Sequence, residues 1–342
     1  MEYRSLGRTG VQVSPLCLGT MTFGDQTEEA EALAIVDCAL DAGINFIDTA
    51  NVYSRGGSEE IVGRALAREG KRSRVVLATK VQGQMADGDP NASGLSRRHI
   101  IEQCEASLRR LQTDYIDLYQ THVASEEIPV DETLRALDDL VCSGKVRYIG
   151  CSNIGSWQVL EALWAARELK LNRYVSVQPA YNMLDRYFER ELIPMAETYG
   201  LAVLPWSPLA AGFLSGKYKR EEEHGAETRL GDPKTFVFFQ ELAFSDAAYQ
   251  VVDVLREISD EKGCTPAQLS LAWCMNQPGV TSPIVGARTA RQLEDSLGAL
   301  SVTITGEDEQ RIDAVAAPGC ATVSFSEWKK PLRFGPHRHS WI

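Results

Sequence analysis

Residues Phe46–Gly63 read FIDTANVYSRGGSEEIVG. A two-residue apolar run ends at the carboxylate of Asp48, and the phenol of Tyr53 follows five residues later. A pair of glycines then leads into a segment with helical character, for which Ser58 is the expected N-cap. The stretch therefore predicts a buried strand that delivers a carboxylate and a phenol into a loop, followed by a helix.

The same alternation of strand and helix recurs along the chain. Short apolar runs, which suit strands buried on both faces, lie at 16–19, 45–48, 75–80, 116–119, 146–150, 175–178, 201–205 and 283–285. Helical apolar spacing occurs at 28–42, 97–111, 130–142, 157–169, 189–199, 246–262 and 266–276. Strands and helices that alternate at intervals of about thirty residues are typical of βαβ units. Eight such units predict an α/β fold, a (β/α)8 TIM barrel.

Three further segments complete the expected organisation of residues 1–342 as a single barrel domain. Residues 3–13 are expected to form a β-hairpin, because glycines flank its turn. A long loop follows strand seven between Trp206 and Pro283, and an irregular tail covers about residues 318–342. An open doubly wound sheet is the alternative fold. No Gly-x-Gly-x-x-Gly follows the first strand, so the dinucleotide-binding fingerprint of that fold is absent.

Composition and charge exclude several classes of function. The net charge is −12, and a strongly acidic chain is a poor partner for nucleic acid or for anionic membranes. No apolar stretch is long enough to span a bilayer, and the N-terminus lacks a signal-peptide pattern. The eight cysteines include no Cys-x-x-Cys pair, which argues against a metal site and predicts reduced thiols. A cytoplasmic protein without a metal is therefore expected.

The ends of the expected strands carry a set of chemically complementary side chains. In a (β/α)8 barrel these ends meet at one mouth, where active sites form. Taken singly, Lys80 is typical of a surface residue and His122 of a structural histidine. Together they converge on Asp48 and Tyr53. Asp48 would pair with Lys80, and a cation beside the phenol would depress the pKa of Tyr53 and make it a proton donor. Such groups cannot supply a hydride, so a redox cofactor is expected.

The sequence resembles the aldo-keto reductase family from the hairpin to about Leu300. The matching motifs are Asp48-Thr49-Ala50-x-x-Tyr53, Thr79-Lys80, Gln120-Thr121-His122, Gly150-Cys151-Ser152-Asn153, Trp206-Ser207-Pro208-Leu209, Leu214-Ser215-Gly216-Lys217 and Gly286-Ala287-Arg288. Within the family, the chain is most similar to the branch that includes potassium-channel β subunits and their bacterial relatives.

The resemblance implies a role for each matching residue. Tyr53 would be the general acid, tuned by Asp48 and Lys80, and His122 would orient the substrate carbonyl. Ser152, Asn153 and Gln178 would hold the carboxamide of a nicotinamide cofactor, and Trp206 would stack on its ring. The remaining cofactor contacts implied are Ser207, Leu209, Gly212 and Lys217 at the pyrophosphate, and Gly286, Arg288, Gln292 and Asp295 at the adenine end. Arg288 would pair with a 2′-phosphate, which favours NADPH over NADH. The family commonly has Glu-Asn where this chain has Asp295-Ser296.

Three functions are compatible with these observations to different degrees. The first is NADPH-dependent, reversible reduction of a small aldehyde or ketone to an alcohol. The second is a redox-sensing, nicotinamide-binding partner protein with little turnover. The presence of all four residues Asp48, Tyr53, Lys80 and His122 argues against it. The third is a cofactor-free hydrolase or isomerase, which would need a metal cluster or a carboxylate pair at the mouth; the sequence shows neither. The oligomeric state is left open.

Overall fold

The computed structural model describes residues 1–342 except 126, 221–224, 226–227, 229, 232–243 and 325–342. Its centre is a parallel sheet in the order β10-β3-β4-β5-β6-β7-β8-β9. The strands are β3 (Cys17–Gly19), β4 (Phe46–Asp48), β5 (Val76–Val81), β6 (Ile116–Thr121), β7 (Val146–Ser152), β8 (Tyr174–Gln178), β9 (Ala202–Val203) and β10 (Ile284–Gly286). Each strand overlaps one of the eight apolar runs, so the predicted strand positions are confirmed.

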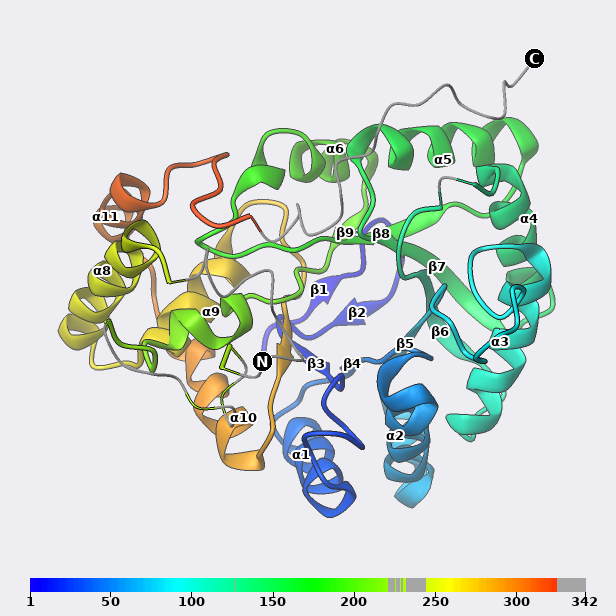
Figure 1. Cartoon of the computed structure of the whole chain (residues 1–342), viewed down its shortest axis with the longest axis horizontal. Helices are drawn as coiled ribbons and strands as arrows, with labels where there is room; N and C mark the ends of the chain where they lie inside the picture. Colours follow the sequence, from blue (N-terminus) through cyan, green and yellow to red (C-terminus); the bar gives the residue numbers. More distant parts are fainter. Residues whose placement is uncertain (126, 221–224, 226–227, 229, 232–243, 325–342) are drawn as a thin grey trace.

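Backbone hydrogen bonds join the two ends of this sheet. The amide of Thr281 donates to the carbonyl of Val203 over 2.9 Å, and the amide of Ile284 donates to the carbonyl of Pro205 over 2.8 Å. These bonds connect β9 to β10 and close the sheet into the predicted (β/α)8 barrel (Figure 1). Closure pairs the two edge strands of this sheet with each other.

Helices surround the barrel in Figure 1. They are α1 (Glu29–Asp41), α2 (Gly57–Ala67), α3 (Arg97–Arg110), α4 (Val130–Cys142), α5 (Ser156–Leu169), α6 (Leu192–Tyr199), α8 (Asp246–Lys262), α9 (Pro266–Asn276), α10 (Ala290–Leu297) and α11 (Gly306–Val315). Short 3-10 turns are η1 (Tyr53–Gly56), η2 (Arg68–Arg74), η3 (Tyr187–Glu189), η4 (Ala210–Ser215) and η5 (Gly298–Ser301). All seven expected helices are confirmed. The expected segments did not include α10 and α11, although Thr289 and Thr305 cap them.

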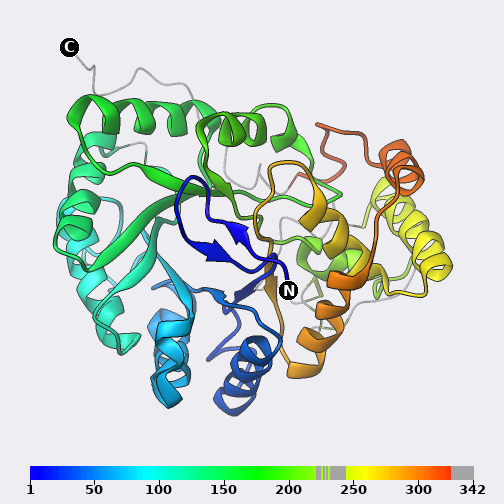
Figure 2. The same ribbon diagram turned by 180° about the vertical axis from the view of Figure 1, so that it is seen from behind.

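The N-terminal hairpin plugs one end of the barrel. It consists of β1 (Arg4–Ser5) and β2 (Gln12–Val13), as predicted, and Figure 2 shows it in front of the strands. Leu6 and Val13 join the apolar cluster inside the barrel with Phe46 and Leu118. The turn lies so close to the strands that a Cβ at Gly7 would be 2.6 Å from the carbonyl oxygen of Val175. The opposite end of the barrel, where the strands end, is therefore the open mouth.

The predicted N-cap at Ser58 is wrong. Helix α2 begins at Gly57, and its N-cap is Gly56, whose φ is 99°. The hydroxyl of Ser58 is buried and donates to the carbonyl oxygen of Thr20 over 2.8 Å. It also lies 3.0 Å from the hydroxyls of Thr20 and Thr49. Because the Ser58 hydroxyl is hydrogen-bonded to residues at the ends of neighbouring strands, it does not cap the helix. The N-cap position is taken by Gly56, which can adopt a left-handed backbone conformation because it has no side chain.

The two irregular segments are described in part. The long segment after β9 contains η4, α8 and α9, and residues 221–224, 226–227, 229 and 232–243 lie outside the described part of the chain. Of the predicted irregular tail, residues 318–324 are described and contain no helix, whereas 325–342 lie outside. Within the described residues, no helix has both the length and the apolar character to cross a membrane.

Candidate active site

The buried ion pair at the mouth joins two adjacent strands. Asp48 ends β4, and Lys80 lies near the end of β5, its parallel neighbour. Both side chains are buried, and Lys80 Nζ forms an ion pair with Asp48 Oδ1. Burial by itself lowers the pKa of Lys80, but the charges of Asp48 and then Tyr53 outweigh it and leave the pKa raised. Lys80 is therefore a permanent cation near neutral pH.

This cation reaches the phenol in the following loop. Lys80 Nζ donates to the backbone carbonyl of Thr49 over 2.9 Å and to the hydroxyl of Tyr53 over 3.3 Å. Tyr53 begins η1, in which Ser54 and Arg55 have positive φ angles of 49° and 54°. Non-glycine residues in this region store backbone strain, which is common at functional loops. The tyrosine is half-buried, so part of its side chain stays accessible while its hydroxyl contacts Lys80.

His122 completes the group of four. It follows β6, and its amide donates to the carbonyl of Val81 over 2.9 Å. Its ring meets that of Tyr53 edge to face, with centroids 5.7 Å apart and an interplanar angle of 81°. The structure thus brings together the four side chains that the sequence placed at the strand ends. Their catalytic roles stay predictions.

The second oxygen of Asp48 is held by two glutamines. Gln120 Nε2 and Gln178 Nε2 each donate to Asp48 Oδ2 over 3.0 Å. Gln178 Nε2 also donates to Gln120 Oε1 over 3.2 Å. Gln178 was expected to face a cofactor carboxamide, and here its amide nitrogen is turned into the barrel. Gln120 belongs to the Gln120-Thr121-His122 motif, but no role was expected for it from the sequence. The signal was its place beside Lys80 at a strand end.

An asparagine organises the adjacent part of the mouth. Asn153 follows β7 with a φ of 49°. Its Nδ2 donates to the carbonyl of His122 over 2.9 Å and to Ser152 Oγ over 3.1 Å. Its Oδ1 accepts a hydrogen bond from Trp206 Nε1 over 3.1 Å. Ser152 Oγ donates in turn to the carbonyl of Gln178 over 2.8 Å. These bonds hold the half-buried indole of Trp206 next to the side-chain amide of Asn153.

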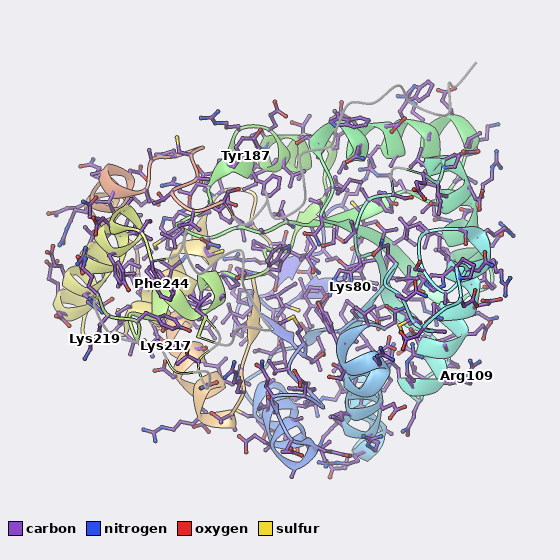
Figure 3. The ribbon with its side chains drawn as sticks, in the orientation of Figure 1. Lys80, Arg109, Tyr187, Lys217, Lys219 and Phe244 are labelled. Carbon is purple, nitrogen blue, oxygen red and sulfur yellow. The ribbon has the colours of Figure 1, made fainter. Side chains whose placement is uncertain are left out.

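The segment after Trp206 forms a tight left-handed turn. Ser207, Ala210, Ala211 and Gly212 have φ angles of 57°, 48°, 56° and 90°. A Cβ at Gly212 would lie 3.3 Å from Lys217 Nζ, so the lysine ammonium covers the turn. Figure 3 shows Lys217 on the side of α8 and α9, well separated from Lys80 in the barrel. The structure therefore places Lys80 beside Tyr53 and Lys217 at the turn that was expected from the sequence to meet a pyrophosphate. Leu209, next to this turn, is half-buried.

The predicted adenine contacts lie around the start of α10. Gly286 ends β10, and the amide of the half-buried Arg288 donates to Gln292 Oε1 over 2.9 Å. Asp295, two thirds of the way along the helix, faces α9 instead. Its carbonyl and Oδ1 accept from Gln268 Nε2 over 2.8 and 3.2 Å. Arg288 and Gln292 are thus hydrogen-bonded neighbours, as expected of two residues at one site. Asp295 instead joins α10 to α9.

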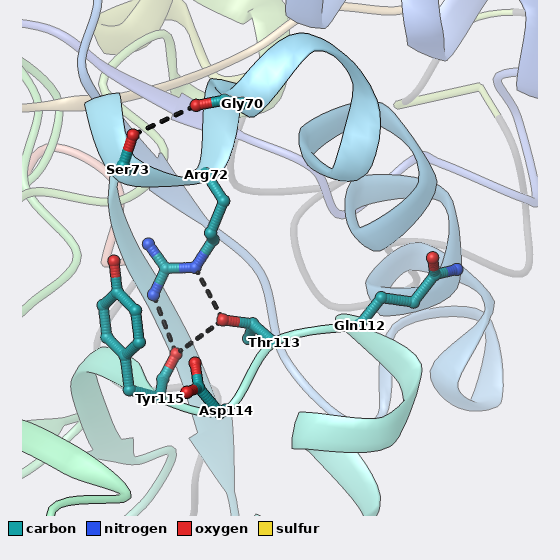
Figure 4. Close-up of a pocket in the computed structure, with 7 residues that line it drawn as sticks. All are labelled: Gly70, Arg72, Ser73, Gln112, Thr113, Asp114 and Tyr115. Carbon is teal, nitrogen blue, oxygen red and sulfur yellow. Dashed lines mark hydrogen bonds between the residues drawn. The ribbon is translucent and has the colours of Figure 1, made fainter.

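A surface depression lies elsewhere on the barrel. It is lined by Gly70, Arg72, Ser73, Gln112, Thr113, Asp114 and Tyr115 (Figure 4). Arg72 donates to Thr113 Oγ1 over 3.0 Å and to the carbonyl of Tyr115 over 2.7 Å, and it pairs with Asp117. These bonds use the guanidinium to join η2 to the segment before β6. The depression is at the starting ends of β5 and β6, away from the mouth.

The fold is a closed barrel whose mouth holds a lysine-paired carboxylate beside a phenol and a histidine. Residues 15–317 match the model of the Aldo/keto reductase family. The chain belongs to this family, and the resemblance inferred from its motifs is confirmed.

Curated relatives include both enzymes and channel subunits. The "Uncharacterized oxidoreductase YrpG" of Bacillus subtilis is 39% identical over 96% of this chain and 100% of its own. A "Probable voltage-gated potassium channel subunit beta" of Oryza sativa is 39% identical over 92% of this chain and 96% of its own. The "Versiconal hemiacetal acetate reductase" of Aspergillus parasiticus is 35% identical, with 93% and 98% covered. These names agree with the branch inferred from the sequence and support an oxidoreductase.

Proposed function

We propose that the protein reduces an aldehyde or a ketone to an alcohol, reversibly, with NADPH as the preferred reductant. The observation that carries this proposal is the 3.3 Å hydrogen bond from Lys80 Nζ to the Tyr53 hydroxyl, next to the buried Lys80–Asp48 pair. A permanent cation beside a phenol stabilises the phenolate, which makes the phenol a better proton donor. General acid catalysis of this kind contributes about 10²–10⁴-fold to a rate.

Each of the four residues has a distinct task in this reaction. Tyr53 donates its proton to the carbonyl oxygen as that oxygen becomes an alcohol, and it takes the proton back in the reverse direction. Lys80 stabilises the phenolate that forms, and Asp48 keeps Lys80 charged and in place. His122, whose ring lies against that of Tyr53, orients the carbonyl oxygen beneath the phenol. The substrate therefore binds between Tyr53 and His122.

The residues at the mouth fit a nicotinamide dinucleotide. Ser152, Asn153 and Gln178 offer side-chain oxygens as acceptors for the N–H groups of a carboxamide, because their own O–H and N–H groups are bonded inside the protein. The indole of Trp206 is held in place by Asn153. The cofactor, when bound, supplies the hydride that these side chains lack.

The phosphates and the adenine end have their own contacts. Ser207, Leu209 and Gly212 form a turn that allows close backbone approach, and Lys217 supplies a cation for the pyrophosphate. Gly286, Arg288 and Gln292 would meet the adenine end. Asp295, whose Oδ1 accepts from Gln268 on α9, would reach it only with its other carboxylate oxygen. Arg288 would pair with the 2′-phosphate, which is the reason for preferring NADPH to NADH.

The test is the purified protein with NADPH and a panel of aldehydes and ketones. Oxidation of NADPH that depends on both the protein and a carbonyl compound is the expected result. The same panel with NADH should give slower turnover at equal cofactor concentration. No carbonyl-dependent oxidation with any compound would reject the enzyme.

One alternative is favoured by a specific observation. Several relatives are named as potassium-channel β subunits, which supports a nicotinamide-binding partner protein with little turnover. It would bind NADPH in a titration and fail in the carbonyl panel, whereas the enzyme succeeds in both. The relative named as a hemiacetal acetate reductase favours the enzyme. From the free cysteines, we also infer a cytoplasmic location. The single eight-stranded barrel and the family match over residues 15–317 support one domain over residues 1–342.

A further inference from the structure

A pair of glutamine side chains lies at the bottom of the mouth. Gln120 is on β6 in register with Lys80 on β5, and its side chain is completely buried. Its Nε2 donates to Asp48 Oδ2 over 3.0 Å, and its Oε1 accepts from Gln178 Nε2 over 3.2 Å. Gln178 Nε2 donates to the same Asp48 oxygen over 3.0 Å. The three side chains form a closed ring of hydrogen bonds.

The direction of each hydrogen bond in this ring is determined by Asp48. A carboxylate paired with a lysine can only accept, so both glutamines must turn their NH2 groups toward it. The carbonyl oxygen of Gln120 then faces the second N–H of Gln178. Both N–H groups of Gln178 are used inside the barrel. The one hydrogen-bonding group that Gln178 has left for a ligand is its carbonyl oxygen.

The barrel wall leaves room for Gln120. Its register partner on β7 is Gly150, where a Cβ would lie 3.2 Å from Gln120 Cγ. A contact this short would displace the glutamine side chain. A buried polar residue is costly unless all of its groups are bonded, and here both ends of the Gln120 amide have partners. Its burial, the absence of a side chain at Gly150 and its hydrogen bonds thus all favour this orientation of the Gln120 amide.

We propose that Gln120 is a positioning residue, which holds the Gln178 amide so that its carbonyl oxygen accepts an N–H from the carboxamide of the nicotinamide. This inference rests on the proposed function. Without Gln120, the second N–H of Gln178 has no partner in the barrel, and the amide is free to turn. If Gln120 only filled space, its replacement would change the affinity for a cofactor to the same extent whether or not that cofactor carries a carboxamide NH2 group.

The test compares two reduced cofactors in the absence of substrate. One is NADPH, and the other is its 3-acetylpyridine analogue, in which a methyl group replaces the carboxamide NH2. Dissociation constants are measured from the quenching of tryptophan fluorescence. The variant Gln120→Met should bind NADPH about tenfold more weakly, which corresponds to roughly one hydrogen bond, and should bind the analogue as the wild type does. Leu118→Met, a buried change two residues earlier on the same strand, should leave both constants unchanged.

A second variant tests the direction of the hydrogen bonds. Gln120→Glu keeps the size of the side chain. When protonated, its carboxyl group can donate to Asp48 and accept from Gln178, whereas the ionised form repels Asp48. Its affinity for NADPH should therefore recover as the pH falls from neutral to mildly acidic, relative to the wild type. Gln120→Met should show no such recovery. If Gln120→Met does not melt cooperatively, and so is not properly folded, the pH dependence of Gln120→Glu tests the positioning role of Gln120 instead.

The outcomes separate this inference from the proposed function. Equal weakening of NADPH and the analogue by Gln120→Met, or no weakening of either, would overturn the positioning role while wild-type binding stands. Wild-type protein that binds neither cofactor would overturn the proposed function as well. Selective loss of NADPH affinity, together with recovery of Gln120→Glu at lower pH, would establish the role.

Discussion

Lys80 Nζ and the hydroxyl of Tyr53 lie 3.3 Å apart, although the two residues are 27 positions apart in the chain. Lys80 lies on β5 with a completely buried side chain, and Tyr53 begins η1 in the loop after β4. The contact exists because β4 and β5 are parallel neighbours with Asp48 opposite Ala78, two residues before Lys80. A buried cation is thereby placed against a half-buried phenol.

Replacement of Tyr53 by phenylalanine tests the proton donor. The ring and its contact with His122 would remain, and the hydroxyl would be lost. Tyr53→Phe should lower kcat by about 10²–10⁴-fold, the usual contribution of a general acid. The dissociation constant for NADPH should stay the same, as measured by fluorescence titration. A variant that keeps a near-wild-type rate would remove Tyr53 as the acid.

Replacement of Lys80 by methionine tests the buried ion pair. Asp48 would stay buried without its cation, and breaking a buried pair costs about 3–5 kcal/mol of unfolding free energy. Urea denaturation measures this loss. The double variant Lys80→Met/Asp48→Asn should recover part of the stability and none of the turnover, because the phenol still lacks its cation. Recovery of turnover in the double variant would contradict the role of Lys80.

Replacement of Arg288 by alanine tests the preference for NADPH. An arginine pairs strongly with a phosphate through charge-assisted hydrogen bonds. Arg288→Ala should weaken NADPH by about tenfold or more and leave NADH nearly unchanged, as judged by the two dissociation constants. Arg291→Ala, an exposed arginine in the first turn of α10, is the matched control. Equal losses for both cofactors would exclude a contact with the 2′-phosphate.

His99 predicts a dependence of stability on pH. It is fully buried on α3, and burial lowers its pKa, with the backbone of Gly83 and the charge of Glu102 acting in the opposite direction. The folded protein therefore binds a proton at His99 less readily than the unfolded chain, which takes one up near the usual pKa of about 6.5. Stability should fall as the pH drops below that value. Free energies of unfolding measured from neutral to acidic pH should show this slope.

The control is the variant His99→Gln, which cannot titrate. Its unfolding free energy should decline less steeply than that of the wild type over the same pH range. Parallel curves for the two proteins would show that His99 does not contribute to the acid sensitivity.

The sequence by itself determined the barrel and the residues at its mouth. Apolar runs too short for most helices are typical of buried strands, and the carboxyl ends of parallel strands share one edge of a sheet. Asp48, Lys80 and His122 could therefore be grouped from their positions at three strand ends alone. Tyr53 could be added because it lies in the loop that follows Asp48.

Only the tertiary structure decided how these side chains are connected. Ser58 reads locally as an N-cap, but contacts with Thr20 and Thr49 use its hydroxyl. Gln178 reads as a cofactor ligand, but its amide nitrogen bonds to Asp48, 130 positions away. The direction of a side-chain amide depends on which of its partners can only accept a hydrogen bond. That information arises when distant strands are brought together in the closed barrel, and no local pattern of residues contains it.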